Sequence, residues 1–338
     1  MTKRGRGRCG AAWLLALAMA PGLAVAEVGS ASGDTPQVWL QRMAEAGRKL
    51  DYQGTYVYQH NRRTEVVDIV HRVSEGLEQE RITSVNGAAR EVLRHGQEVT
   101  CILPENKSVV VGRGHALNPF ANALLGTPSG IAEHYKTSFG GEDRIAGLRA
   151  REIVITPKDP YRYGYRLWLE QNTGLLLKSE LRDGGKEPLE QVMFTRVELG
   201  NAIPPEAVAA TLNDDEYTWF REDDNDGDDN PARQTVAHSA WKVAWVPTGF
   251  AQQMDKEHAL AASGGKVEHQ VYSDGLAAVS VYVELAPSQA QPGGVSRMGA
   301  VHAYDGWVDG HRVTVVGEVP AATVRRIGES VQHRGDGS

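Results

Sequence analysis

Hydrophobic positions recur along the chain with two different periods. Between Thr35 and Leu50 they return at steps of three and four residues, which is the spacing of one helical face. Thr35 followed by Pro36 is a typical helix start, with a capping hydroxyl and a proline in the first turn. We therefore predict one amphipathic helix from Pro36 to about Leu50, with its apolar stripe at Trp39, Leu40, Met43, Gly47 and Leu50.

From Tyr52 onward the rhythm changes to a period of two, which is typical of strands with one buried face. Short alternating segments are separated by Gly, Asn and Pro, and this indicates an antiparallel meander rather than alternating strands and helices. Helical interruptions are expected at 118–126 and within 129–136, where they could cover the buried face. The predicted strands cover 52–59, 67–73, 79–85, 89–95, 97–103, 107–111, 150–156, 161–170, 175–182 and 188–199.

A second β-rich unit follows an acidic segment without apolar residues. Residues 222–231 are mostly Asp, Asn, Glu and Gly, and such a like-charge block repels itself and does not pack. We interpret 216–234 as a flexible linker and 235–333 as a small α+β domain. Within that domain, Asp309-Gly310 predicts a type I′ hairpin, and a closing helix begins at Pro320.

The first 26 residues have the pattern of a secretory signal. A basic start precedes an apolar run from Ala11 to Ala20, and Ala24-Val25-Ala26 is a small-residue cleavage site. We predict export to the periplasm with cleavage near Ala26, so that the larger domain would span 27–215. The alternative is an uncleaved N-terminal anchor.

The net charge of the chain bears on its possible partners. The net charge is −7, and removal of the four basic residues before Ala11 leaves 32 basic residues against 43 acidic ones, or −11. This balance argues against nucleic acid as a partner.

Cys101 would be the single cysteine of the mature chain, so an internal disulfide is impossible. It lies in an apolar strand, which favours a buried inert thiol over a reactive one.

A search for catalytic and metal-binding motifs finds none that is complete. In the acidic segment an EF-hand alignment puts Glu222 at position one, where Asp is the usual ligand, and Arg233 at position twelve, where a bidentate Glu is needed. There is no His-Glu-x-x-His, no Cys-x-x-Cys, no Gly-x-Ser-x-Gly and no P-loop. We therefore expect no catalytic residues, no metal and no cofactor.

One strand-like segment, residues 161–169, carries an unusual set of side chains. Tyr161, Tyr163 and Tyr165 would share one face with Leu167, while Arg162 and Arg166 would lie on the other. This pattern fits an ordinary strand with its aromatic face in the core. It also fits the wall of an apolar ligand cavity with a basic rim.

Several motifs resemble the RseB/MucB family of periplasmic sigma-factor regulators. They include Tyr52-Gln53-Gly54-Thr55-Tyr56-Val57-Tyr58 and Thr173-Gly174-Leu175-Leu176-Leu177-Lys178-Ser179 in the first unit. In the second they include Trp245-Val246-Pro247-Thr248-Gly249-Phe250 and Tyr272-Ser273-Asp274-Gly275-Leu276. The likeness runs in order over nearly the whole chain after the signal sequence.

The resemblance implies a fold and a non-enzymatic function. The larger domain would be an unclosed β-barrel, LolA/LolB-like, with helices in its concavity. The smaller would bind the periplasmic region of a membrane-anchored RseA/MucA-type anti-sigma factor and shield it from site-1 proteolysis until a lipid or lipopolysaccharide signal causes release. A homo-oligomer is possible, and the alternatives are a lipoprotein or lipid carrier and an envelope hydrolase. Lipid contacts are expected at Tyr161, Tyr163, Tyr165, Leu167, Phe120, Leu124, Arg162 and Arg166, and partner contacts at Trp245, Phe250, Tyr272 and Tyr282.

Overall fold

The computed structural model describes residues 34–113, 131–212, 216–221, 239–259, 266–285 and 293–335. The predicted signal sequence, the helix expected at 118–126 and most of the acidic segment lie outside these ranges. Within them, no helix combines the length and the apolar character needed to cross a membrane.

The first helix, α1 (Pro36–Lys49), begins and ends where the sequence predicts. The Thr35 hydroxyl accepts a hydrogen bond from the backbone N–H of Val38 at 3.3 Å, so the predicted cap is confirmed. Trp39, Leu40, Met43 and Ala46 are buried. The helix packs on the sheet, because the Arg151 guanidinium lies over the Trp39 ring and Gln37 donates a hydrogen bond to Thr137.

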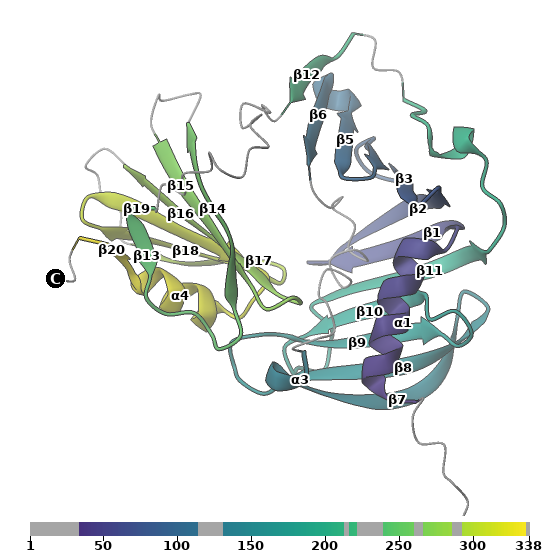
Figure 1. The fold of residues 1–338 in the computed structure, drawn as a ribbon, viewed down its shortest axis with the longest axis horizontal. Helices are drawn as coiled ribbons and strands as arrows, with labels where there is room; N and C mark the ends of the chain where they lie inside the picture. The colour runs from purple at the N-terminus through teal and green to yellow at the C-terminus, as the bar shows by residue number, and fades with distance from the viewer. Residues whose placement is uncertain are drawn as a thin grey trace, which may run out of the picture. The chain divides into compact units, whose positions relative to one another are not determined.

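The N-terminal sheet has twelve strands in the order β12-β6-β5-β4-β3-β2-β1-β11-β10-β9-β8-β7 (Figure 1). All neighbours are antiparallel except β12 and β6. The pairing of β1 with β11 joins the first half of the meander to the second. The strands are β1 (Tyr52–His60), β2 (Arg63–Ser74), β3 (Leu77–Ser84), β4 (Glu91–His95), β5 (Glu98–Leu103), β6 (Ser108–Arg113), β7 (Tyr135–Ile145), β8 (Leu148–Pro157), β9 (Gly164–Glu170), β10 (Leu176–Arg182), β11 (Glu190–Leu199) and β12 (Thr218–Arg221), with short helices η1 (Pro104–Asn106), α3 (Ile131–His134) and η2 (Pro205–Val208).

Two of these strands were not predicted. Of the helix expected within 129–136, the described residues include the four of α3, and Tyr135 already belongs to β7. β7 lies at the end of the sheet and exposes its charged middle, so no alternating pattern marks it. β12 lies inside the segment interpreted as linker and pairs with β6, although all four of its residues are exposed.

The strand expected at 161–170 begins later than predicted. β9 starts at Gly164, so Tyr161, Arg162 and Tyr163 precede it and do not follow its alternation. Within β9, Tyr165 and Leu167 pair with Ile155 and Ile153 of β8. Both faces of this strand are buried, because Lys178 and Arg166 cover the ring of Trp168 on the opposite side.

The C-terminal sheet has six antiparallel strands in the order β14-β15-β16-β19-β18-β17. Alternate valines of β16 and β19 form its core with Val324 and Ile327 of the closing helix. Asp309 and Gly310 both have positive φ angles, 48° and 75°, which confirms the predicted type I′ hairpin. The elements are β13 (Trp241–Val243), β14 (Ala251–Ala259), β15 (Lys266–Ser273), β16 (Ala278–Leu285), β17 (Gly294–Met298), β18 (Val301–Val308), β19 (His311–Gly317), α4 (Ala321–Glu329) and β20 (Val331–His333), with β13 and β20 forming a separate pair.

Candidate functional site: the junction between the two sheets

Polar side chains from both sheets meet at one place, which we call the junction. Its N-terminal contributors lie at the start of β7, in the segment between β8 and β9, and on β9 and β11. Its C-terminal contributors lie before β14, in the turn between β15 and β16, and around the start of α4.

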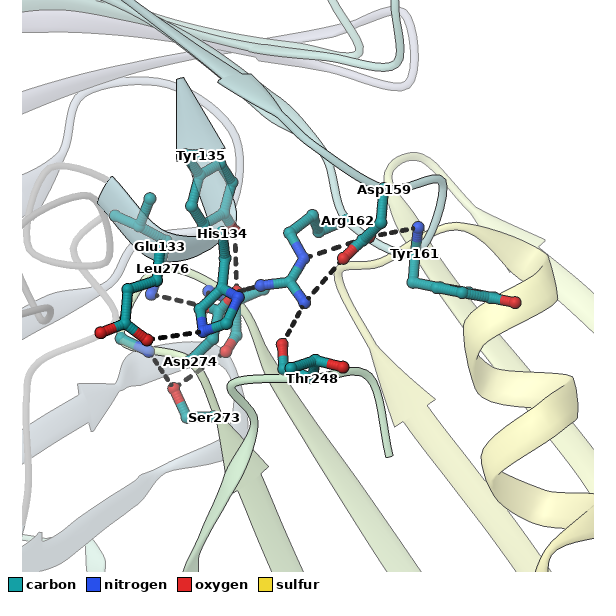
Figure 2. A network of polar contacts seen from close by, with 12 residues as sticks. Glu133, His134, Tyr135, Asp159, Tyr161, Arg162, Thr248, Ser273, Asp274 and Leu276 are labelled. Carbon is teal, nitrogen blue, oxygen red and sulfur yellow. Dashed lines mark hydrogen bonds and ion pairs between the residues drawn. The ribbon is translucent and has the colours of Figure 1, made fainter. Parts of the chain in front are cut away.

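Arg162 is the centre of the junction (Figure 2). Its side chain is fully buried and its guanidinium reaches three separate segments. Nη1 donates to Asp274 at 2.6 Å, Nη2 donates to the Thr248 carbonyl oxygen at 2.7 Å, and both Nε and Nη2 contact Asp159. A planar guanidinium that donates to several partners at once holds them in a defined geometry.

The buried carboxylate of Asp274 is the main C-terminal partner of Arg162. Besides the guanidinium it accepts hydrogen bonds from the Tyr135 hydroxyl at 2.9 Å and from the backbone N–H groups of Leu276 and Ala277. Burial, and then the nearby Asp274 charge, raises the pKa of Tyr135, so that its phenol remains a donor. The charge pair is therefore buried with its hydrogen-bonding capacity satisfied, which is the condition under which such a pair is tolerated.

Beside Arg162, Tyr161 connects to the closing helix. Its carbonyl oxygen accepts a hydrogen bond from the Thr323 hydroxyl at 2.8 Å, and its own hydroxyl contacts Arg326. The Tyr161 ring lies edge-on to the Trp245 ring, with centroids 4.9 Å apart, and the Arg326 guanidinium lies 4.0 Å above Trp245. This cluster extends the junction along α4.

Tyr163 and Tyr165 bind polar groups of the C-terminal sheet with their hydroxyls. Tyr163 Oη lies 3.3 Å from Nδ1 of His302, and that nitrogen lies 2.8 Å from the Val319 carbonyl oxygen. Tyr165 Oη donates to the Leu276 carbonyl oxygen at 3.3 Å. Burial raises the pKa of Tyr163 to about 12.

Apolar contacts accompany the polar ones. Ala300, at the tip of the β17–β18 hairpin, is fully buried and belongs to the hydrophobic cluster of the N-terminal sheet. Leu276 packs against the same cluster. At Gly249 the backbone approaches so closely that an added Cβ would overlap the His134 ring. The two sheets thus share part of one core.

Two hollows adjoin the junction. The inner cavity, of about 280 Å³, has apolar walls from Tyr56, Val67, Ile82, Val92, Leu181 and Val192, and polar groups from Tyr58, His60, Glu65, Arg90, Glu190 and Glu318. The outer cleft, of about 620 Å³, lies at the ends of β8, β9 and β10 and includes Arg166, Arg182, Arg297 and His302. A cleft of this size is within the range of small-molecule sites.

The residues predicted as lipid contacts are only partly brought together. Arg162, Tyr163, Tyr165 and Arg166 line the outer cleft, whereas Leu167 is core and Tyr161 contacts Trp245. Phe120 and Leu124 lie outside the described residues. Arg162 is placed differently from the basic rim that the alternation predicted, since its buried guanidinium already contacts Asp159, Asp274 and Thr248 at the junction.

The residues predicted as partner contacts also fall into different environments. Phe250 and Tyr272 are in the core of the C-terminal sheet, with 7% and 8% of their surfaces exposed, so they do not form an open docking surface. Tyr282 is partly exposed and stacks on His269. Trp245 contacts Tyr161 and Arg326 in the junction itself.

Sequence reasoning missed the acidic members of the junction. Asp274 stands in the sequence only within the motif Tyr272-Ser273-Asp274-Gly275-Leu276, and no sequence pattern singles out Glu190 or Glu318. Their partners are far away in sequence: Arg162 and Asp274 are 112 positions apart. A buried acidic residue beside a turn glycine can indicate a contact between distant segments. The sequence around these three residues does not show that they are buried.

The described residues contain no group of three or more His, Cys, Asp and Glu placed to hold a metal ion. Cys101 is half-buried, and burial raises the pKa of its thiol, which fits an unreactive thiol. The protein has two sheets, each with its own apolar core, that meet at a polar junction beside two hollows. This architecture fits a binding protein.

Comparison with known proteins identifies the family. The MucB/RseB N-terminal domain matches residues 35–212, and the MucB/RseB C-terminal domain matches residues 235–332. This chain therefore belongs to the MucB/RseB family, a family of non-enzymatic sigma-factor regulatory proteins.

Relatives and solved structures agree with this assignment over most of the chain. The sigma factor AlgU regulatory protein MucB of Pseudomonas aeruginosa is 33% identical, over 87% of this chain and 90% of MucB. The sigma-E factor regulatory protein RseB of Salmonella typhimurium is 25% identical over the same share of this chain and 90% of that protein. The crystal structure of MucB in complex with MucA(peri) superposes with a TM-score of 0.70 at 29% identity, covering 88% of this chain and 99% of that one.

Proposed function

We propose that this protein is a periplasmic negative regulator of the envelope stress response. It binds the periplasmic region of a membrane-anchored anti-sigma factor of the RseA/MucA type and shields that region from the site-1 protease. The observation that carries the proposal is the likeness to MucB in its complex with MucA(peri), which extends over both sheets.

The signal that releases the partner is, in this proposal, a lipid or lipopolysaccharide bound at the N-terminal sheet, which would form an unclosed barrel. The outer cleft supports this, because it combines the apolar side chains of Val154, Ile155 and Tyr163 with several arginines. An amphipathic anion could bury its chain against the first set and its charged groups against the second. It would release the partner only if it favours the arrangement that binds the partner less well.

The central test is protection of the partner from proteolysis. Adding the full chain to the anti-sigma periplasmic region should slow its cleavage by the site-1 protease, with half-maximal protection at the dissociation constant of the complex. An unrelated substrate of the same protease serves as the control and should be cut at an unchanged rate. Equal cleavage with and without saturating chain would rule the regulator out.

Release of the partner by a lipid in the outer cleft is tested at Arg297. This residue lines the cleft and has no ion-pair partner among the described residues. Loss of a charge-assisted contact costs about 1.5–3 kcal/mol, so Arg297→Gln should require roughly tenfold or more anionic lipid to release the partner. Arg312→Gln, which removes an exposed arginine outside the cleft, is the matched control. The same lipid response in both variants would mean that the cleft is not the lipid site.

The carrier alternative gives a different outcome in the same experiments. A lipid carrier would bind the lipid, and Arg297→Gln would weaken that binding, but no protection of the anti-sigma region would appear. The C-terminal sheet favours the regulator, since a simple carrier does not require a second cored unit.

A further inference from the structure

Two carboxylic acids from different sheets meet in the inner cavity. Glu190 is the first residue of β11, and Glu318 follows the last residue of β19. Both line the cavity, and Glu190 helps to raise the pKa of Glu318 through its charge and through a side-chain hydrogen bond. A hydrogen bond between two carboxyl groups needs a proton on one of them, because two carboxylates are both acceptors.

Glu190 is also tied to its own sheet. Its Oε2 accepts a hydrogen bond from the Tyr58 hydroxyl at 2.5 Å, and the β17–β18 hairpin tip at Gly299 packs next to its Oε1. Burial, and then the contact with Glu190, raises the pKa of Tyr58, so its phenol stays a donor. Glu190 is thereby fixed as an acceptor that faces the C-terminal sheet.

The basic side chains near Glu190 and Glu318 contact another acidic residue. His60 and Arg90 line the same cavity, but both contact Glu65 of β2, at 3.1 Å and 3.7 Å. Among the described residues, no basic side chain forms an ion pair with Glu190 or Glu318. From β9, only the neutral Tyr165 faces the cavity, and from β10 Ser179 does.

Burial and the adjacent Glu190 raise the pKa of Glu318 from its ordinary value of 4.5 to about 8. At neutral pH the pair therefore holds one proton while the sheets are together. When the sheets separate, water reaches both groups and Glu318 returns to its ordinary range.

We propose that Glu190 and Glu318 are a proton-dependent latch between the two sheets, which is closed when the pair shares a proton and weakened as pH rises. The sign follows from linkage, because the closed state binds a proton that the open state releases. The advantage of the closed state is complete below about pH 4.5 and is lost as the pH rises to about 8. Within that window the ratio of open to closed molecules should rise by up to about tenfold per pH unit.

The latch is tested by measuring the open fraction of the full chain against pH, without any partner or lipid. Spin labels on Glu98→Cys in β5 and Lys242→Cys in β13 report the distance between an exposed position of the N-terminal sheet and an exposed position of the β13–β20 pair, after Cys9→Ser and Cys101→Ser remove the native thiols. Pulsed electron resonance from pH 5 to pH 9 then gives the open fraction. The open fraction of the parent chain should rise with pH.

Glu318→Gln keeps a donor for Glu190 but cannot ionise, so its open fraction should stay low and independent of pH. Glu190→Gln removes the adjacent charge and should weaken the pH dependence without abolishing it, because burial still raises the pKa of Glu318. This second variant keeps the test valid if Glu318→Gln fails to fold by circular dichroism. The matched control is Glu187→Gln, an exposed carboxyl three residues before Glu190, which should behave like the parent. A parent that does not open with pH, or four profiles of equal slope, would overturn the proposal. Because no anti-sigma factor is present, this result is independent of the partner-protection test.

Discussion

At the scale of single residues, Arg162 contributes most to the junction. It is a cation with no exposed side-chain surface, and such a group is tolerated only when its charge and its donors are satisfied. Asp274 supplies the charge, while Asp159 and Thr248 supply the remaining acceptors. Removing one partner would leave the other buried with unmet hydrogen-bonding capacity.

We expect Arg162→Ala to lower the free energy of unfolding by about 3 kcal/mol, the lower end for a broken buried pair, because Asp274 keeps its bonds to Tyr135 and the backbone. Urea unfolding measures the loss. Arg312→Ala breaks a pair that is 44% exposed at the arginine and should cost less than about 1 kcal/mol. Equal losses in the two variants would contradict the role assigned to Arg162.

At the scale of elements, the seam between β1 and β11 holds the N-terminal sheet together. Gly54 of β1 lies against β11 so closely that a Cβ there would be 2.3 Å from the backbone carbonyl oxygen of Arg196. A backbone atom in a paired strand cannot move aside cheaply. The glycine is therefore required by the approach of the two strands rather than by a turn.

Gly54→Ala should destabilise the protein by about 1–3 kcal/mol, the usual cost of overpacking, with a matching decrease in thermal midpoint. Gly141→Ala in β7 is the matched control, because nothing lies within 4 Å of its added Cβ. The control should lose no stability. If scanning calorimetry gave the two variants the same midpoint, steric contact with Arg196 would not be the reason for Gly54.

The sequence was informative where a local rule decides the structure. The Thr35 cap and the Asp309-Gly310 hairpin are determined by neighbours in the chain, and both were predicted. β7 and β12 were missed because strands at the ends of a sheet need not alternate in polarity. Their positions are set by the strands they pair with.

The junction could be predicted only from one side. The segment 161–166 stands out for its tyrosines and arginines, and two of these tyrosines and both arginines line the outer cleft. That Arg162 faces Asp274 depends on how the two sheets meet, which no local pattern encodes. Alternation also failed at Arg162, because β9 begins only at Gly164.

At the scale of the whole molecule, each sheet has its own apolar cluster, and the C-terminal sheet also completes the cluster of the other. Ala300 and Leu276 pack into the N-terminal core, and Asp274 is neutralised from outside its own sheet. Separating the two units would uncover these groups. Binding measured with either sheet alone would therefore include surface that the intact chain keeps buried.

The geometry of Arg162 also bears on how the sheets could part. One rigid, flat group is bonded at the same time to the segment before β9, the segment before β14 and the turn after β15. A small slide of one sheet would misalign several of these bonds together, so intermediate positions gain little from those that remain. The two sheets should therefore be either joined or separated, without stable intermediate positions. A modest stimulus would then produce an abrupt response.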